Sequence, residues 1–92
     1  MDNPVIHEYG EKFWYDSNGQ FHRDDGPAQE YADGDKFWLQ HDKRHRYDGP
    51  AVEYADGTNE WWLNDELLTF DEWLNKVDMS DEDKVMMKLK YG

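Results

Sequence analysis

The fold of this chain follows from a stretch that occurs twice, HRDDGPAQEYADG at residues 22–34 and HRYDGPAVEYADG at residues 45–57. The two copies begin 23 residues apart, and a tryptophan follows each at the same offset, Trp38 and Trp61. An imperfect earlier copy at residues 9–14 is shifted by one residue because of an extra residue around Asn18-Gly19. This makes about three units, the number at which stacked repeats begin to bury a shared core.

Each unit is expected to contain a pair of short strands. Asn18-Gly19 predicts a two-residue hairpin turn, because both residue types accept a positive φ, and Asp33-Gly34 and Asp56-Gly57 predict matching turns. The Asp-Gly-Pro segments at residues 25–27 and 48–50 separate the hairpins, since proline lacks an amide donor. The sequence therefore predicts a single antiparallel meander of repeated β-hairpins. Alternation places Val52 and Tyr54 on one face and the side chains at positions 51 and 53 on the other.

The residues after position 68 change to a helical pattern. Thr69 and Glu72 form a capping box, and Phe70, Trp73, Leu74 and Val77 follow on one helical stripe. A second helix is predicted to begin at Ser80, with Val85, Met86 and Leu89 as its apolar face. We expect both helices to pack on one face of the sheet. The prediction is one mainly β (α+β) domain over residues 1–92, with a repeat array at 9–68 and a helical cap at 69–92.

This pattern of aromatic strand, turn, His-containing segment and Asp-Gly turn resembles the MORN-type repeats over about residues 9–68. It resembles more closely the uncharacterised repeat proteins of large phages and giant viruses that carry His-Arg-x-Asp-Gly-Pro-Ala units. The resemblance implies an array that serves as a scaffold, a dimeriser or a binding surface. Because Asp-Gly-Pro stands where the MORN unit has Gly-x-Gly, a lipid-binding role is not transferred to this chain.

Composition narrows the function classes. The chain has 22 acidic and 10 basic residues, a formal charge of −12, which disfavours direct binding to nucleic acid or to anionic membranes. Five Trp, six Tyr and four Phe favour a folded chain in spite of this charge. The absence of cysteine, of a signal-peptide pattern and of a long apolar run leads us to expect a cytoplasmic protein, in the host cell if it is phage-encoded.

Candidate chemistry is weighed against structural roles. His22-Arg23 and His45-Arg46 lie near Asp24, Asp25 and Asp48, but residues repeated at the unit spacing are expected to do the same structural work twice. The acids at positions 33, 35, 56 and 60 lack the spacing of a calcium-binding loop, and no nucleophile or phosphate-binding motif occurs. We therefore expect no enzyme activity, no cofactor and no metal site.

Charge is the feature that points most directly to function. Residues 1–68 hold 16 acids and 6 bases, whereas residues 69–92 hold 6 acids and 4 bases. An acidic repeat face suits a partner protein with a basic surface, and an inhibitor or nucleic-acid mimic of a host factor is one form of this hypothesis. Solubility alone is the competing explanation. The candidate contact residues are Glu30, Asp33, Glu53, Asp56 and Trp62.

Two function classes stay open at this point. The first is a phage-encoded interaction protein, and the second is an assembly module whose sheet edges pair to form a homodimer or a longer array. Trp62 enters the first class because it follows Trp61 directly and so points to the opposite face of the strand.

Overall fold

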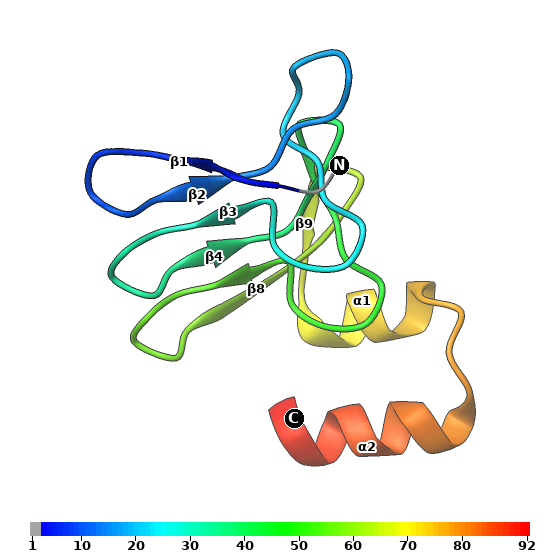
Figure 1. Cartoon of the computed structure of the whole chain (residues 1–92). Helices are drawn as coiled ribbons and strands as arrows, with labels where there is room; N and C mark the ends of the chain where they lie inside the picture. The colour runs from blue at the N-terminus through cyan, green and yellow to red at the C-terminus, as the bar shows by residue number, and fades with distance from the viewer. Residues whose placement is uncertain (1–2) are drawn as a thin grey trace.

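The computed structural model describes residues 3–92 and shows a mainly antiparallel β architecture with two short helices (Figure 1). A seven-stranded sheet runs in the order β1, β2, β3, β4, β7, β8, β9. Its strands are β1 (Val5–Ile6), β2 (Lys12–Phe13), β3 (Gln29–Glu30), β4 (Lys36–Phe37), β7 (Val52–Glu53), β8 (Asn59–Leu63) and β9 (Glu66–Leu68). The remaining strands, β5 (Leu39–Gln40) and β6 (Lys43–Arg44), form a separate two-stranded sheet. The predicted meander is confirmed. The β5–β6 hairpin lies outside it, in the connection between β4 and β7.

The turns between β1 and β2, between β3 and β4 and between β7 and β8 lie along one side of the large sheet (Figure 1). Asp33-Gly34 and Asp56-Gly57 form turns as predicted, with Gly34 at φ +105° and Gly57 at φ +93°. Neighbouring turns also contact each other, because the amide of Ala55 donates to Asp35 Oδ1 at 2.7 Å. The turn at residues 54–57 is thus tied to the turn that precedes it in the array.

A second set of turns includes two that the sequence analysis did not predict and one that it predicted wrongly. His41-Asp42 and Asn64-Asp65 are two-residue turns in which both residues have positive φ. At Asn18-Gly19, by contrast, only Gly19 has positive φ, and the turn is closed by a hydrogen bond from the amide of Asp16 to the carbonyl of Gln20. The prediction of a two-residue turn there is wrong, because the extra residue of the first unit enlarges its loop.

The second residue of each two-residue turn pins it to the preceding hairpin. Asp42 Oδ1 accepts the amide of Phe21 at 2.6 Å, and the amide of Asp42 donates to the Phe21 carbonyl at 2.8 Å. Asp65 makes the same pair of contacts with the backbone of Arg44, at 3.3 and 2.9 Å. These pairs stack the hairpins on one another independently of the large sheet.

The strand register defines the two faces of the large sheet. Lys12, Glu30, Lys36, Glu53 and Asn59 lie opposite one another on successive strands and therefore share one face. Trp14, Trp38 and Trp61 each lie two residues beyond a member of this line, so we call this side the tryptophan face. The opposite side, the tyrosine face, carries a chain of edge-to-face aromatic contacts formed by Phe13, Tyr31, Phe37 and Tyr54.

The first helix, α1 (Phe70–Lys76), forms as predicted and covers β8 and β9. Thr69 Oγ1 accepts the amide of Glu72, and the Glu72 carboxylate accepts the amide of Thr69. Trp73, Leu74 and Val77 are buried in one core with Trp61 and Leu68. The capping box and the apolar stripe are both confirmed.

The second helix, α2 (Asp81–Tyr91), begins after Ser80, whose Oγ accepts the amide of Asp83. Its predicted apolar face is wrong, because Val85, Met86 and Leu89 are exposed. The helix instead contacts the core through Met87 and Tyr91, with the Tyr91 ring 5.0 Å from that of Trp61. The reason is that α1 already covers the β8–β9 surface, so α2 lies outermost and touches the core along one flank (Figure 1).

Replacing Trp61 by alanine is expected to lower the free energy of unfolding by about 3–5 kcal/mol, because its ring lies at the centre of the contacts among the sheet, α1 and α2. Urea unfolding followed by circular dichroism measures the effect. Leu89→Ala is the matched control, and we expect it to change stability by less than about 0.5 kcal/mol, because Leu89 is exposed. A Trp61→Ala midpoint close to that of the control would contradict this core assignment.

Candidate functional site

Each repeated arginine lies flat on the tryptophan that precedes it in the chain. The guanidinium carbon of Arg46 lies 3.7 Å from the ring centre of Trp38, and that of Arg23 lies 3.9 Å from the ring of Trp14. A desolvated guanidinium over an indole is a favourable cation–π contact. The His-Arg motif therefore covers the tryptophan face with a cation rather than with an apolar layer.

The Asp-Gly-Pro segment wraps around this guanidinium. Arg46 Nε donates to Asp48 Oδ1 at 2.8 Å, and Arg46 Nη1 donates to the Pro50 carbonyl at 3.0 Å. A Cβ atom at Gly49 would lie 2.7 Å from the guanidinium carbon, so a larger residue there must displace the Arg46 guanidinium. Arg23, Asp25, Gly26 and Pro27 repeat the arrangement one unit earlier. The motif is thus a built cradle for the arginine.

The repeated histidines hold the turn of the next hairpin. His22 Nδ1 accepts the backbone amide of His41 at 3.1 Å, and His45 Nδ1 accepts that of Asn64 at 2.9 Å. Burial lowers the pKa of His45, which favours the neutral ring that this acceptor role requires. The shared contact supports the structural role expected for a residue repeated at the unit spacing.

Glu30 and Glu53, two of the predicted contact residues, are only half-exposed on the tryptophan face. Glu30 Oε2 lies 3.4 Å from Arg23 Nη1, and Glu53 Oε1 lies 3.7 Å from Arg46 Nη1 and 3.3 Å from Trp38 Nε1. Lysines 12 and 36 alternate with these glutamates across the strands. The structure therefore does not join the two glutamates into an uninterrupted acidic row.

Asp33 and Asp56, the other two predicted acids, lie in exposed turns rather than on the strand face. The oxygen Oδ1 of each accepts a backbone amide two residues ahead, from Asp35 at 3.0 Å and from Thr58 at 2.9 Å. The bond from Thr58 lowers the pKa of Asp56. Both carboxylates close their own turns and still face solvent.

Trp62 lies on the tyrosine face, opposite Trp61 as expected. It is half-buried, because the Arg44 guanidinium covers the ring at 4.8 Å and its indole nitrogen donates to Glu60 Oε1 at 3.0 Å. The structure thus separates Trp62 from the four predicted acids, which lie on other parts of the surface.

The most exposed carboxylates near the repeat motif are those of Asp24, Asp25 and Asp48, which we call the loop carboxylates. Their side chains are 84%, 76% and 80% exposed. They border a recess of about 620 Å³ whose lining includes Trp38, Arg46 and the exposed ring of Tyr47. Sequence reasoning expected a structural role for the repeated residues here and did not name these aspartates as contact residues, although their recurrence after each His-Arg pair was visible.

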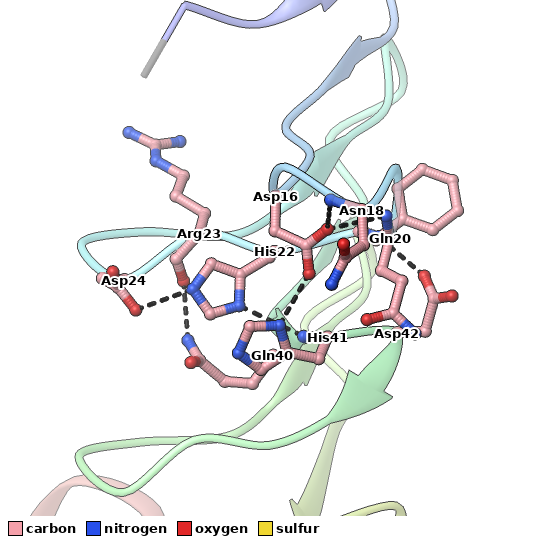
Figure 2. Close-up of polar contacts among 10 residues, drawn as sticks. Asp16, Asn18, Gln20, His22, Arg23, Asp24, Gln40, His41 and Asp42 are labelled. Atoms are coloured by element: carbon pink, nitrogen blue, oxygen red, sulfur yellow. Dashed lines mark hydrogen bonds and ion pairs between the residues drawn. The ribbon is translucent and has the colours of Figure 1, made fainter. Parts of the chain in front are cut away.

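A second polar cluster joins the turns of the first two hairpins (Figure 2). His41 Nδ1 lies 2.6 Å from Asp16 Oδ2, and the His41 ring lies 4.1 Å from that of His22. The hydrogen bond from His41 lowers the pKa of Asp16. Sequence analysis missed this cluster because Asp16 and His41 are 25 residues apart and do not recur in the next unit, where Gln40 and Asn64 stand instead.

Gly49→Ala is expected to destabilise the protein by about 1–3 kcal/mol, because the new methyl group displaces the Arg46 guanidinium from Trp38. Arg46→Ala should cost a similar amount, and the double variant should cost little more than either single variant. A double-mutant cycle from urea unfolding measures this coupling. Strictly additive effects would show that Gly49 is required for a reason other than the arginine.

Stability should fall as the pH drops from about 7.5 to about 5.5, in part through His45. Its folded-state pKa is lowered, so the unfolded chain binds more protons and the contribution is lost below the unfolded value of about 6.5. The matched variant His45→Gln should show a flatter dependence in this window. The carboxyl groups with lowered pKa, Asp16 and Asp56, act only at lower pH. Parallel curves for the two proteins would exclude His45 as the source.

No family model, no curated protein and no solved structure matches this chain. The likeness to MORN-type repeats stays a prediction from the sequence. Within residues 3–92, neither helix has the length and apolar character needed to cross a membrane.

Proposed function

We propose that this chain is a non-enzymatic protein-interaction module that binds a basic segment of a partner protein through the loop carboxylates. The supporting observation is the recess itself, where three exposed aspartates stand around aromatic side chains. Each aspartate is held by an internal contact through Oδ1, Asp24 to His22 and the other two to arginines. Positioned carboxylates lose little side-chain freedom when a partner binds.

The chemistry of the recess suits a lysine or arginine side chain. The three loop carboxylates outnumber the two arginines that contact them, Arg23 and Arg46. The ring of Tyr47 is exposed beside them and offers a face for a cation. A protruding basic side chain would therefore find both a carboxylate and an aromatic surface.

The four acids predicted from the sequence as contact residues differ in how accessible they are to a partner. Glu30 and Glu53 lie beside the same arginines, but their side chains are only 30% and 34% exposed, so a partner reaches them less readily than the loop carboxylates. Asp33 and Asp56 remain exposed in the turns and form a second acidic surface that adds to long-range attraction. The phage origin and the role as an inhibitor of a host factor rest on the resemblance of the repeat sequence.

The test compares three proteins as baits in a bacterial lysate: the wild type, the loop variant Asp24→Asn/Asp25→Asn/Asp48→Asn, and a control variant. The control, Glu66→Gln/Asp78→Asn/Glu82→Gln, changes the net charge equally at exposed acids on β9, after α1 and on α2. Asparagine keeps the oxygen that accepts the internal hydrogen bonds, so the fold should persist, as circular dichroism would show. We expect the wild type and the control to capture the same basic protein, and the loop variant to lose it.

The affinity for the captured protein is then measured at low and high salt. We expect binding to weaken with salt, because exposed charges are screened. The loop variant should bind at least about tenfold more weakly, a loss of roughly 1.4 kcal/mol. Equal affinity of all three proteins at both salt concentrations would overturn the proposal.

The competing function is self-assembly, and the exposed sheet edges favour it as the second candidate. Val5 and Ile6 on β1 and Leu67 on β9 are exposed apolar residues on the two edge strands. Unpaired edges of this kind can add strands from another copy. Sedimentation velocity over a range of concentrations separates the two functions, since assembly requires a concentration-dependent rise in mass that the interaction module does not.

A further inference from the structure

Asp16, His22 and His41 bring three metal-ligating side chains together at the junction of the first two hairpins (Figure 2). One donor atom from each residue lies within 4.8 Å of the other two. They come from separate segments: Asp16 opens the first hairpin loop, His22 follows that hairpin, and His41 opens the turn between β5 and β6. The stacking of the two hairpins therefore creates this cluster.

Two of the three side chains are oriented by further contacts. Asp16 Oδ1 accepts the amides of Asn18 at 2.8 Å and Gln20 at 3.0 Å, which leaves Oδ2 directed at His41. His22 Nε2 lies 3.0 Å from Asp24 Oδ1. A proton on Nε2 toward this carboxylate leaves Nδ1 with its lone pair, and ligating histidines in metal sites commonly donate their other nitrogen to a carboxylate in this way.

The next unit supplies an internal comparison. His45 makes the same backbone contact as His22. The positions around His45 that correspond to Asp16 and His41 hold Gln40 and Asn64. The structural role of the repeated histidine therefore needs neither Asp16 nor His41. The first unit departs from the repeat at these two positions, and both departures introduce a metal-ligating group.

We infer that Asp16, His22 and His41 form a binding site for a divalent transition metal of the zinc type, which joins the first two hairpins. Two imidazoles and one carboxylate are a donor set that suits this class of cation. The metal replaces the proton between His41 Nδ1 and Asp16 Oδ2, and that proton goes to solvent. His22 Nδ1 supplies the third ligand in place of its bond to the His41 amide, which is exposed and accessible to water.

The geometry requires small movements of the side chains. Ligand atoms around a tetrahedral zinc ion stand roughly 3.3 Å apart, from metal–nitrogen distances of about 2.0–2.1 Å. The contact between His41 Nδ1 and Asp16 Oδ2 must open from 2.6 Å. The His41 side chain is 61% exposed and is free to rotate, whereas Asp16 and His22 are more deeply held. The three residues leave a fourth ligand position for water or another ligand.

The test is titration of the untagged full chain, first freed of metal by a chelator, with ZnCl₂ in a calorimeter. We expect one zinc ion per chain, release of protons in buffers of different ionisation heat, and a higher melting temperature with zinc than without. Co²⁺ in place of zinc should give the visible absorption of a low-symmetry nitrogen–oxygen site. MgCl₂ is the control for nonspecific attraction to the acidic surface, and it should not raise the melting temperature comparably.

His41→Asn gives this position the residue found in the next unit, Asn64, and asparagine tolerates the positive φ of the turn. Asp16→Asn removes the carboxylate but keeps an oxygen for the amides of Asn18 and Gln20. Each should weaken zinc binding at least about tenfold while the metal-free protein stays folded. His45→Gln, outside the cluster, should bind zinc as the wild type does. Absence of a one-to-one zinc site in the wild type, or unchanged zinc affinity in His41→Asn and Asp16→Asn, would overturn the inference.

Discussion

The stacking of each repeated arginine on the tryptophan that precedes it in the chain is the interaction on which the array depends. A sheet built mostly from two-residue strands has short hydrogen-bonded ladders, so it must be stabilised by what covers its faces. Arg23 and Arg46 provide that cover on the tryptophan face, and their guanidinium groups are held by the Asp-Gly-Pro segments. A strongly acidic chain thus uses its few arginines at the positions where a cation does structural work.

The last tryptophan of the array, Trp61, is covered by apolar rings and not by an arginine. His-Arg occurs at positions 22–23 and 45–46, and the next positions at the same spacing hold Leu68-Thr69. Thr69 caps a helix instead of continuing the array. Phe70 and Trp73 then pack against Trp61, so apolar rings take the place of the guanidinium. The indole nitrogen of Trp73 donates to the Arg46 carbonyl at 2.9 Å, which ties the helix back to the preceding unit. The helix is therefore the means by which the repeat ends.

Features that depend on local sequence were predictable, and those that depend on stacking were not. The capping box at Thr69 and the Asp-Gly turns follow from short-range chemistry and formed as expected. The exposed side of α2 was not predictable, because Val85, Met86 and Leu89 are apolar and only the prior placement of α1 leaves them uncovered. The candidate site shows the same limit. The charge of Glu30 and Glu53 was visible in the sequence, whereas the strand register brings lysines beside them and the folded loops bring arginines.

Because each arginine covers the tryptophan that precedes it in the chain, a block such as residues 24–46 contains both a tryptophan and the arginine that covers it. The hairpins are joined by backbone amides and by the aspartate of each two-residue turn, which are the same from one unit to the next. A gene segment encoding one such block can therefore be duplicated in frame, because the added block makes the same contacts with the blocks on both sides. The number of blocks sets the length of the array, so evolution can change that length without altering the two ends of the protein.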